Sequence, residues 1–281
     1  MKKLRIMSTN QWACDRNMPE WEKIGQDCSP EARMPGFLKY YLETKPDVLG
    51  LQEVTARMAD KLMQLFSDNN LPYALLWGRD TPIIYRTDLF ELVDSTFLIY
   101  PDNIPEYEGI FNNSKTKSYN LGVFRIKETG ALFILTTTHL WYKVSNPESK
   151  SYQAFSDEAR AYQINLAIDA IDKFQTKYNC PAILMGDLNA TRTSQALEAA
   201  FNRGFEHCYD LAVEHRDEGH GCHYCFPDGY KPYTPKSAIN AIDHILVKGL
   251  AKDAVRTFDR YAPDYYMCLS DHIPVWIDVN I

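Results

Sequence analysis

The sequence predicts an α/β (α+β) fold in which mixed β-sheets are layered against helices. Short apolar runs typical of strands alternate along the 281 residues with longer segments of helical apolar spacing. Several neighbouring strands are separated only by short turns, as antiparallel pairs are. No internal repeat and no Pro/Gly/Ser-rich linker divides the chain, so one domain spanning residues 1–281 is expected.

The first part of the chain is expected to alternate strand and helix. Residues 4–8 form a short apolar run typical of a strand. Residues 34–42 have apolar side chains at helical spacing, and Pro46 ends that helix because proline cannot continue it. Residues 48–51 are a buried-strand run, and residues 55–66 are amphipathic at the helical period.

The middle of the chain is expected to hold mainly short strands. They are predicted at residues 73–77, 83–85, 89–93, 121–126 and 131–138. The last two flank Glu128-Thr129-Gly130, a turn sequence that joins antiparallel strands. We therefore expect part of the sheet structure to be antiparallel.

The last part of the chain begins with a long helix over residues 157–176, where Ile164, Ile168 and Ile171 recur at helical spacing. Residues 208–240 are irregular and rich in Gly, His, Pro and Tyr. The other elements expected are strands at 182–185, 242–247 and 275–279 and a helix at 195–201.

The composition excludes some classes of protein. An apolar content of 45% is ordinary for a globular domain and too high for a disordered chain. The 30 basic and 37 acidic residues give a net charge of −7, whereas proteins that bind duplex DNA through its phosphates usually carry a basic excess. Nucleic acid as a partner is therefore disfavoured, although a local basic patch is compatible with this total.

Cysteine usage and the N-terminus indicate a compartment. The seven cysteines are odd in number and show no small-domain spacing, which favours reduced thiols. The first seven residues contain two lysines but no apolar core of a signal peptide. No apolar run approaches the roughly 18 residues of a membrane span. A soluble, cytoplasmic protein without a membrane span is expected.

Apolar runs repeatedly end in a small cluster of carboxylate, amide or imidazole side chains. The six clusters are Thr9-Asn10, Gln52-Glu53, Thr138-His139, Asp187-Leu188-Asn189, Ile242-Asp243-His244 and Ser270-Asp271-His272. Strand ends and the loops after them are where a rigid scaffold presents reactive groups. If these ends converge, the site holds several carboxylates, two amides and at least two imidazoles.

That inventory suits metal-assisted hydrolysis of a phosphoester. Hard oxygen ligands select Mg²⁺, Mn²⁺ or Ca²⁺ over Zn²⁺. The remaining carboxylates and imidazoles can activate water and protonate a leaving group. Acyl transfer fits poorly, because no G-x-S-x-G elbow is present and no cysteine has an obvious partner.

Each of these residues also has a simpler interpretation. Asn10 could hydrogen-bond a turn, Glu53 could interact with a helix N-terminus, and His139 could be a satisfied buried histidine. The other members could be capping residues or isolated surface groups. The recurrence of all six clusters in one order along the chain favours the catalytic interpretation.

An ordered set of motifs runs from position 8 to position 275. It consists of Ser8-Thr9-Asn10, Pro46-Asp47-Val48-Leu49-Gly50-Leu51-Gln52-Glu53, Pro82-Ile83-Ile84-Tyr85-Arg86, Thr138-His139-Leu140, Ala159-Arg160 with Gln163, Gly186-Asp187-Leu188-Asn189, Ile242-Asp243-His244-Ile245 and Ser270-Asp271-His272-Ile273-Pro274-Val275. The set resembles the endonuclease/exonuclease/phosphatase superfamily of DNase I-like, metal-dependent phosphoesterases. The resemblance implies a four-layer α/β sandwich, with two central mixed sheets flanked by helices.

The resemblance also implies a metal centre and a nucleophile site. Glu53 is implied as the principal ligand of a catalytic Mg²⁺, for which Mn²⁺ or Ca²⁺ could substitute. Asn10 is implied beside it, and Asp271 as a further metal or water ligand. Asp187 is implied to orient or deprotonate the attacking water, and Asn189 to hold the phosphate or the transition state.

Two histidines take further implied roles. Asp243 is implied to orient the ring of His272, which would contact the phosphate as acid, base or electrophile. His139 is implied to contact the phosphate or leaving group, and its presence points away from the abasic-site DNA-repair branch. Some nucleases of the family carry a metal-binding aspartate where this sequence has Trp12, so a second metal on that side is not expected.

The loops around this centre are expected to select the substrate. Four are long: residues 12–33, 100–117, 141–156 and 208–240. Trp12 and Trp141, together with Tyr142 and Phe226, could offer stacking faces to a substrate or could pack on the core. Lysines 143, 150, 231 and 236 could meet further phosphates or be solvated.

Three functions therefore remain open at the level of the sequence. The favoured one is a phosphodiesterase or phosphomonoesterase acting on a small molecule or a lipid head group. A nuclease or deadenylase-like enzyme on single-stranded nucleic acid is the alternative within the family. A non-catalytic binding protein on the same fold is the third.

A short Cys/His segment also admits a zinc interpretation. Cys222 and Cys225 have the internal spacing of a zinc half-site, but a partner Cys-x-x-Cys is missing. The other ligands would have to come from Cys208 and the neighbouring histidines His207, His215 and His220. Free thiols are the simpler interpretation.

Overall fold

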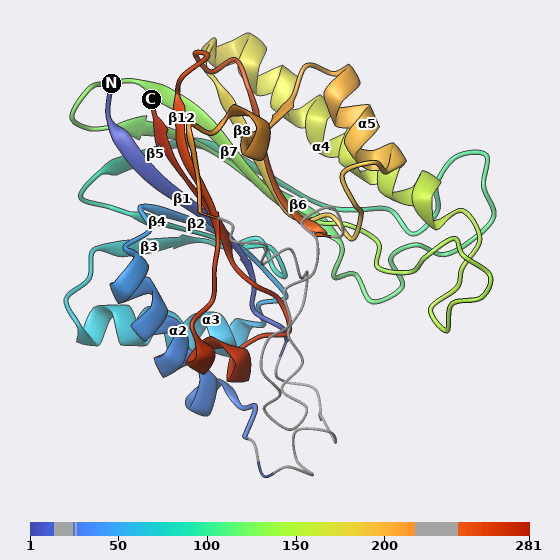
Figure 1. The fold of residues 1–281 in the computed structure, drawn as a ribbon, viewed down its shortest axis with the longest axis horizontal. Coiled ribbons are helices and arrows are strands. Elements are labelled where there is room, and N and C mark those ends of the chain that lie inside the picture. The colour runs from blue at the N-terminus through green and yellow to red at the C-terminus, as the bar shows by residue number, and fades with distance from the viewer. Residues whose placement is uncertain (14–24, 26, 217–240) are drawn as a thin grey trace.

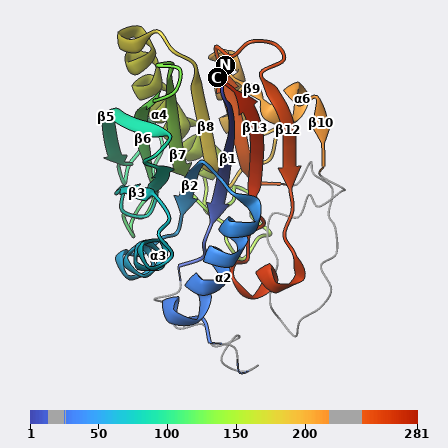
Figure 2. The same cartoon turned by 90° about the vertical axis from the view of Figure 1, so that its left-hand side faces the viewer.

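The computed structural model describes residues 1–13, 25, 27–216 and 241–281. One sheet of the described chain has the strand order β10-β12-β13-β1-β2-β4-β3. Its strands are β1 (Lys3–Asn10), β2 (Val48–Gln52), β3 (Tyr73–Leu76), β4 (Ile83–Arg86), β10 (Glu214–His215), β12 (Val255–Arg260) and β13 (Val275–Asn280). Figure 2 shows β1 between β13 and β2, with the two chain termini side by side.

The second sheet has the order β5-β6-β7-β8-β11-β9 among the described residues. Its strands are β5 (Phe90–Ile99), β6 (Ser118–Ile126), β7 (Leu132–His139), β8 (Ala182–Asp187), β9 (Glu206–His207) and β11 (Asp243–Lys248). Strands β6 and β7 form the antiparallel pair expected from the turn between them. Strands β7 and β8 run parallel, so the sheet is mixed.

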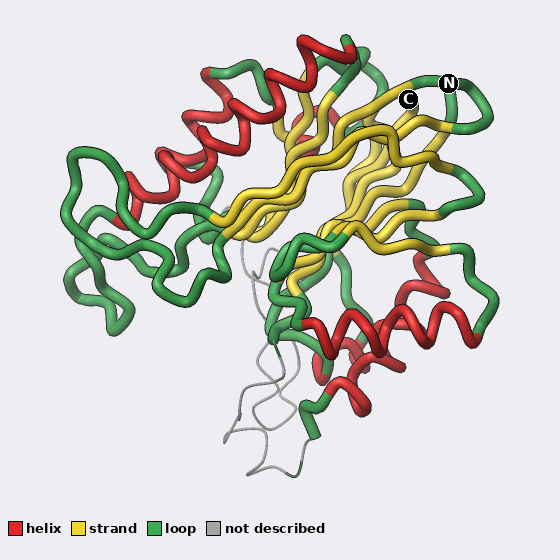
Figure 3. Tube along the Cα trace, turned by 180° about the vertical axis from the view of Figure 1, so that it is seen from behind, coloured by secondary structure: helices red, strands yellow, loops and turns green. Residues whose placement is uncertain are grey.

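Helices cover the outer faces of both sheets, which gives four layers (Figures 1 and 3). Helices α2 (Pro30–Thr44) and α3 (Ala56–Asp68) lie on the first sheet, and α4 (Ser156–Tyr178) and α5 (Gln195–Asn202) lie on the second. Short helical segments occur at α6 (Cys208–Leu211) and η3 (Asp264–Cys268). The predicted fold class, two mixed sheets flanked by helices, is confirmed.

Three apolar clusters separate these layers. Leu4 and Ile6 of β1 pack between the sheets, whereas Met7 of the same strand packs under α2 and α3. A third cluster lies between the second sheet and helices α4 and α5. Strands buried on both faces read as continuous apolar runs, which is why most of them could be found in the sequence.

Side-chain caps fix where three of the helices begin. Ser29, Thr55 and Ser194 each accept a hydrogen bond from the backbone N–H three residues later, at the start of α2, α3 and α5. These bonds satisfy N–H groups that have no partner inside a helix. The helices therefore start within a few residues of the positions expected from apolar spacing alone.

The topology brings the ends of several strands to one edge of the sandwich. Strand β1 is parallel to β2, with Asn10 opposite Gln52. Strand β7 is parallel to β8, with His139 opposite Asp187. Strand β11 is antiparallel to β8 and begins with Asp243 opposite Asp187. The polar clusters at these positions are therefore neighbours.

The sequence missed several elements near the C-terminus. Strand β12 interrupts its apolar residues with Arg256, Asp259 and Arg260, so it shows no buried-strand run. Strands β9 and β10 are two residues long and too short to show a period. Helix α6 and strand β10 also lie within the segment expected to be irregular. No helix of the described chain is long and apolar enough to cross a membrane.

A buried histidine pair links β9 to β11. The backbone N–H of Tyr209 donates to His207 Nδ1 (3.1 Å), so His207 Nε2–H must donate to His244 Nδ1 at 3.0 Å. His244 Nε2–H then donates to the carbonyl oxygen of Ala190 (2.8 Å). Every ring nitrogen is satisfied only while both rings are neutral, and burial lowers the pKa of His244 to about 3 and that of His207 well below its usual value.

We expect this pair to make the fold sensitive to mild acid. Unfolded histidines titrate near pKa 6.5, so below that pH the unfolded state binds more protons than the folded one. Below pH 6.5, each histidine should therefore lower the free energy of unfolding by about 1.4 kcal/mol for every unit by which the pH is lowered. Urea unfolding at pH 7 and pH 5 measures the loss.

The variant His244→Gln should be less stable at pH 7 but should lose less stability between the two pH values. His215→Gln, which replaces an exposed histidine, is the matched control and should keep the wild-type slope. An unchanged slope in His244→Gln would contradict this assignment.

Candidate active site

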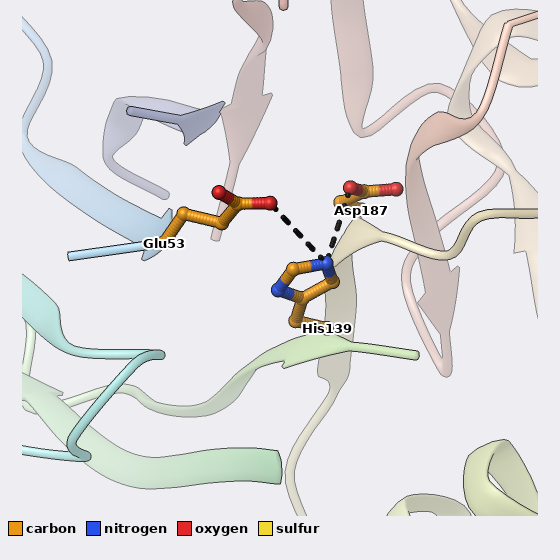
Figure 4. Close-up of side chains that lie close together, drawn as sticks. All are labelled: Glu53, His139 and Asp187. Atoms are coloured by element: carbon orange, nitrogen blue, oxygen red, sulfur yellow. Dashed lines mark ion pairs between the residues drawn. The ribbon is translucent and has the colours of Figure 1, made fainter. Parts of the chain in front are cut away.

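The polar clusters predicted from the sequence converge on the edge of the sandwich where the strand ends meet. Asn10 and Glu53 come from the first sheet, and His139 and Asp187 from the second. Figure 4 shows the carboxylates of Glu53 and Asp187 directed at the same nitrogen of His139. Glu53 Oε1 lies 3.9 Å and Asp187 Oδ2 lies 3.4 Å from His139 Nε2.

Glu53 is held by the backbone turn that ends β2. Its φ of 56° reverses the chain just after Gln52, whose buried amide donates to Thr137 Oγ1 of the other sheet at 2.8 Å. Glu53 Oε2 accepts a hydrogen bond from the backbone N–H of Ala13 (3.2 Å), and Oε1 lies 3.4 Å from the amide of Asn10. The carboxylate is thus held by residues at the end of β1, and the residue before it is bonded to the other sheet.

Asp187 lies at the centre of the site. Its Oδ2 accepts from Asn10 Nδ2 (3.1 Å) and its Oδ1 from the backbone N–H of Asn189 (2.9 Å). Gly186, at φ 145°, lets β8 approach β7 here, because a Cβ at this position would lie 1.9 Å from the carbonyl oxygen of Thr138. A glycine is therefore required immediately before Asp187.

His272 and Asp243 form a buried pair on the other side of Asp187. His272 Nδ1 lies 2.8 Å from Asp243 Oδ2, which leaves Nε2 facing Asp187 Oδ2 at 3.8 Å. Ser270 Oγ donates to the carbonyl oxygen of Asn10 (2.7 Å) and accepts from the N–H of His272 (3.0 Å). These bonds fix the loop before β13 relative to the end of β1.

The charges in the site keep two carboxylates ionised. Burial raises the pKa of Glu53, but His139, Lys117 and His272 outweigh it and lower the pKa to about 2. The same balance lowers the pKa of Asp187, where burial is opposed chiefly by His272 and His139. Both side chains therefore act as carboxylates at neutral pH.

The neighbouring carboxylates favour the protonated form of His272. Burial opposes protonation of His272, yet Asp243 and Asp187 raise its pKa well above the usual value. Burial raises the pKa of Asp243, and it raises that of Asp271 to about 6. His272 is therefore a cation that can face negative charge in the site.

Two further residues at the site were missed from the sequence. Lys117 is buried, and its ammonium group contacts the ring of His139, with Nζ 3.2 Å from Nδ1. Asp80 Oδ2 lies 3.4 Å from that same His139 Nδ1. Lys117 does not follow an apolar run. Asp80 comes three residues after the run at 73–77, and this signal was not used.

Other predicted site residues are placed less directly. Asn189 donates its side-chain amide to the carbonyl oxygen of Leu140 (3.1 Å). Asp271 Oδ1 is buried, lies 4.0 Å from His272 Nε2, and has no hydrogen-bond partner within the described part of the chain. Two groups of three side chains bring their ligand atoms close enough together to hold a metal ion, and Asp271 belongs to neither.

The expectation that two tryptophans offer stacking faces is not supported. Trp141 is 1% exposed and packs edge-on against Phe111. Trp12 is 8% exposed, with the Arg33 guanidinium 5.3 Å from its ring centroid. Both rings belong to the packed interior, whereas Tyr142 is 49% exposed. Both tryptophans lie in loops, which suggested that they were exposed, but their apolar rings pack on the core.

The Cys/His segment that suggested zinc lies outside the described residues, as do Phe226, Lys231 and Lys236. Among its proposed partners, His207 is engaged with His244, Cys208 is buried and His215 is exposed. The zinc interpretation therefore stays a prediction.

The donor atoms of the site could hold a divalent metal ion. Glu53, His139 and Asp187 place one ligand atom each within 4.8 Å of one another, and so do Asp187, Asp243 and His272. In the second group Asp243 and His272 already bind each other, so the first group offers the freer carboxylates. Carboxylate oxygens suit a hard cation. Asn10 directs its Nδ2 toward these carboxylates, and its Oδ1 accepts a hydrogen bond from the N–H of Trp12 (2.8 Å).

The sequence and the fold can be compared with those of known proteins. A model of the endonuclease/exonuclease/phosphatase family matches residues 29–272. No curated protein gives a significant sequence match.

Solved structures share the fold at low identity. An endonuclease/exonuclease/phosphatase family protein from Bacteroides thetaiotaomicron has a TM-score of 0.75 at 20% identity, covering 99% of this chain and 98% of that one. A mannosyl-6-phosphatase of the same organism has a TM-score of 0.72 at 20% identity, covering 99% and 100%. D. rerio TDP2, complexed with single-strand DNA product, has a TM-score of 0.63 at 17% identity and covers 100% of both chains.

Proposed function

The chain belongs to the endonuclease/exonuclease/phosphatase family, and from that premise we propose that it hydrolyses a phosphoester with the help of a divalent metal ion. One observation carries the proposal. The Asp187 carboxylate is held by the amide of Asn10 between the imidazoles of His139 and His272. A binding protein that had lost catalysis would have no need of this buried and costly arrangement of charges.

We propose that Glu53, with Asn10 and Asp187 beside it, holds Mg²⁺, and that Mn²⁺ or Ca²⁺ can substitute. The fit rests on the carboxylate oxygens of Glu53 and Asp187 and on the buried Oδ1 of Asp271 nearby, which has no hydrogen-bond partner among the described residues. When bound, the ion would polarise phosphoryl oxygens and neutralise part of their charge. A second metal beside Trp12 is not proposed, because that residue offers no oxygen ligand and is buried.

We assign the other steps to residues of the chain. Asp187, an ionised carboxylate fixed from two sides, orients the attacking water and accepts its proton. Protonated His272 places Nε2–H toward the phosphoryl group and stabilises the charge that develops there, while Asp243 fixes the ring. His139 contacts the phosphate or leaving group from the side of Lys117.

We propose a small phosphorylated molecule or a lipid head group as the substrate. The net charge of −7 supports this choice, because single-stranded nucleic acid is usually held in a basic groove. The fold of a mannosyl-6-phosphatase is compatible with it. A nuclease remains the second candidate, since the fold is also that of a protein complexed with single-strand DNA product.

A panel of phosphoesters tests this function. We expect turnover of at least one phosphomonoester or phosphodiester in the presence of Mg²⁺, Mn²⁺ or Ca²⁺, and a weak dependence of its rate on salt. A steep loss of rate with rising salt on an oligonucleotide would favour the nuclease. No metal-stimulated turnover of any member would return the protein to the non-catalytic alternative.

A further inference from the structure

A cavity of about 500 Å³ opens beside the proposed catalytic centre. It borders Glu53 and His139, and its other walls are Asp80, Lys117, Tyr142 and the turn of residues 113–116. Its volume lies in the range that takes a small molecule. Because His139 forms both the edge of the catalytic centre and a wall of the cavity, a group bound here would be attached directly to the reacting phosphorus.

One wall of this cavity is shaped by the hydrogen bonds of a buried asparagine. Asn112 donates its side-chain amide to the carbonyl oxygens of Tyr100 (2.7 Å) and Lys117 (2.8 Å) and accepts from the N–H of Lys117 (2.9 Å). The hydroxyls of Ser114 and Thr116 bond to each other at 2.8 Å. The turn is thus shaped before any ligand binds, which lowers the entropic cost of binding.

The opposite wall is anchored by helix α4. Gln163 accepts a hydrogen bond from the N–H of Trp141 (2.8 Å), and Arg160 donates to the carbonyl oxygen of the same residue at 3.1 Å. The buried Trp141 ring fixes the backbone, and the next residue, Tyr142, is half exposed. Tyr142 therefore lines the cavity from a rigid base, with Lys117 Nζ 5.6 Å from the centroid of its ring.

The lining combines this aromatic face with many small polar groups. Asp80 offers a carboxylate, Lys117 an ammonium group, and the 113–116 turn an amide and two hydroxyls. A lipid tail would leave the carboxylate, the ammonium group and the hydroxyls of the lining unpaired, and a nucleobase would leave most of them unpaired. A ring that carries hydroxyls on its edge and C–H groups on its face satisfies both kinds of wall.

We propose that this cavity binds the leaving group of the phosphoester, and that the leaving group is a polyhydroxylated ring of the sugar or cyclitol class. Tyr142 packs against the face of the ring, and Asp80 with the 113–116 turn receives its hydroxyls. The proposal rests on the phosphoesterase function proposed above and names the substrate class for it.

The test compares two esters that share a six-membered ring and a CH2–O–P linkage and differ in the hydroxyls and the ring oxygen. Hexose 6-phosphate and cyclohexylmethyl phosphate, which carries a six-membered ring without hydroxyls, are each supplied as the monoester and as the methyl diester with Mg²⁺ or Mn²⁺. A site built to hydrogen-bond hydroxyls rejects the analogue that lacks them, so kcat/KM should favour the hexose ester by about 100-fold or more. Thymidine 5′-phosphate methyl ester serves as the nucleoside comparison.

Variants of the exposed tyrosine test the wall itself. Tyr142→Ala should reduce the ratio of kcat/KM for the hexose ester to that for the cyclohexylmethyl ester by about tenfold, because the stacking face is lost. Tyr142→Phe keeps the ring and should keep most of the ratio. Tyr152→Ala replaces another exposed tyrosine of the same loop and is the matched control, with an unchanged ratio.

The possible outcomes separate the two proposals. Equal kcat/KM for the hexose and cyclohexylmethyl esters, a preference for the nucleoside ester, or an unchanged ratio in Tyr142→Ala overturns the leaving-group assignment and leaves the phosphoesterase function intact. Absence of turnover on all of these esters with every cation overturns the function, and the assignment with it.

Discussion

The variant Asp187→Asn is expected to hydrolyse its phosphoester about 10²–10⁴-fold more slowly than the wild type, which is the range for loss of a positioned base. The change keeps the shape of the side chain and removes its charge. Asn10 donates to Asp187 Oδ2 and the N–H of Asn189 donates to Oδ1, so the carboxylate accepts bonds that an amide can only partly replace. Initial rates under saturating metal and substrate measure the effect on kcat.

The control for this prediction is Asp210→Asn, which neutralises an exposed carboxylate paired with Arg192. It should retain the wild-type rate. The urea midpoint of Asp187→Asn separates loss of chemistry from loss of fold, because an unfolded fraction large enough to mimic the rate would shift the midpoint. A folded Asp187→Asn protein with full activity would remove Asp187 from the mechanism.

The sequence predicted the fold well wherever a strand is buried on both faces. Residues 48–51 and 182–185 are uninterrupted apolar runs because one face packs between the sheets and the other packs under helices. Strand β12 escaped because Arg260 and Asp259 lie within it, buried against the core edge instead of exposed. Local periodicity reports burial, and it fails where buried polar groups bond to their neighbours.

Some residues of the candidate site could be predicted from the sequence, and others could not. Asn10, Glu53, His139 and Asp187 could be found because each lies at the end of a strand or directly after it. Parallel strands place these ends at one edge of the sheet. Lys117 precedes a strand and reaches His139 through the antiparallel pairing of β6 with β7, where Ser118 lies opposite His139. That register is a long-range property, so the residue types alone could not indicate it.

Packing of the loops on the core explains why the two tryptophans are not exposed. Trp141 leaves β7 two residues after His139 and turns inward against Phe111, so the exposed face falls to Tyr142. A loop position indicates accessibility only on average.

We propose that residues 1–281 act as one unit, since β1 and β13, from opposite ends of the chain, pair beside the site.

Removing the metal ion is expected to have the second large effect, and Glu53→Gln should reproduce it. An ion that binds only the folded protein stabilises it by about 2.7 kcal/mol at 100 times its dissociation constant, which raises the Tm by several degrees. We expect Mg²⁺ or Mn²⁺ to raise the Tm of the wild type, EDTA to reverse the shift, and Glu53→Gln to show little shift at the same concentration. Glu198→Gln, an exposed glutamate on α5, should respond as the wild type does.

The two perturbations also make a quantitative argument together. If Glu53 acts by holding the ion, then removing the ion and removing the carboxylate eliminate the same interaction, so their effects on rate should not add. EDTA should therefore lower the rate of the wild type by orders of magnitude and that of Glu53→Gln by little more. A Tm shift of wild-type size in Glu53→Gln, or additive losses of rate, would place the ion elsewhere. The ionised carboxylate of Glu53, whose pKa is lowered to about 2 by His139, Lys117 and His272, would then serve substrate binding instead.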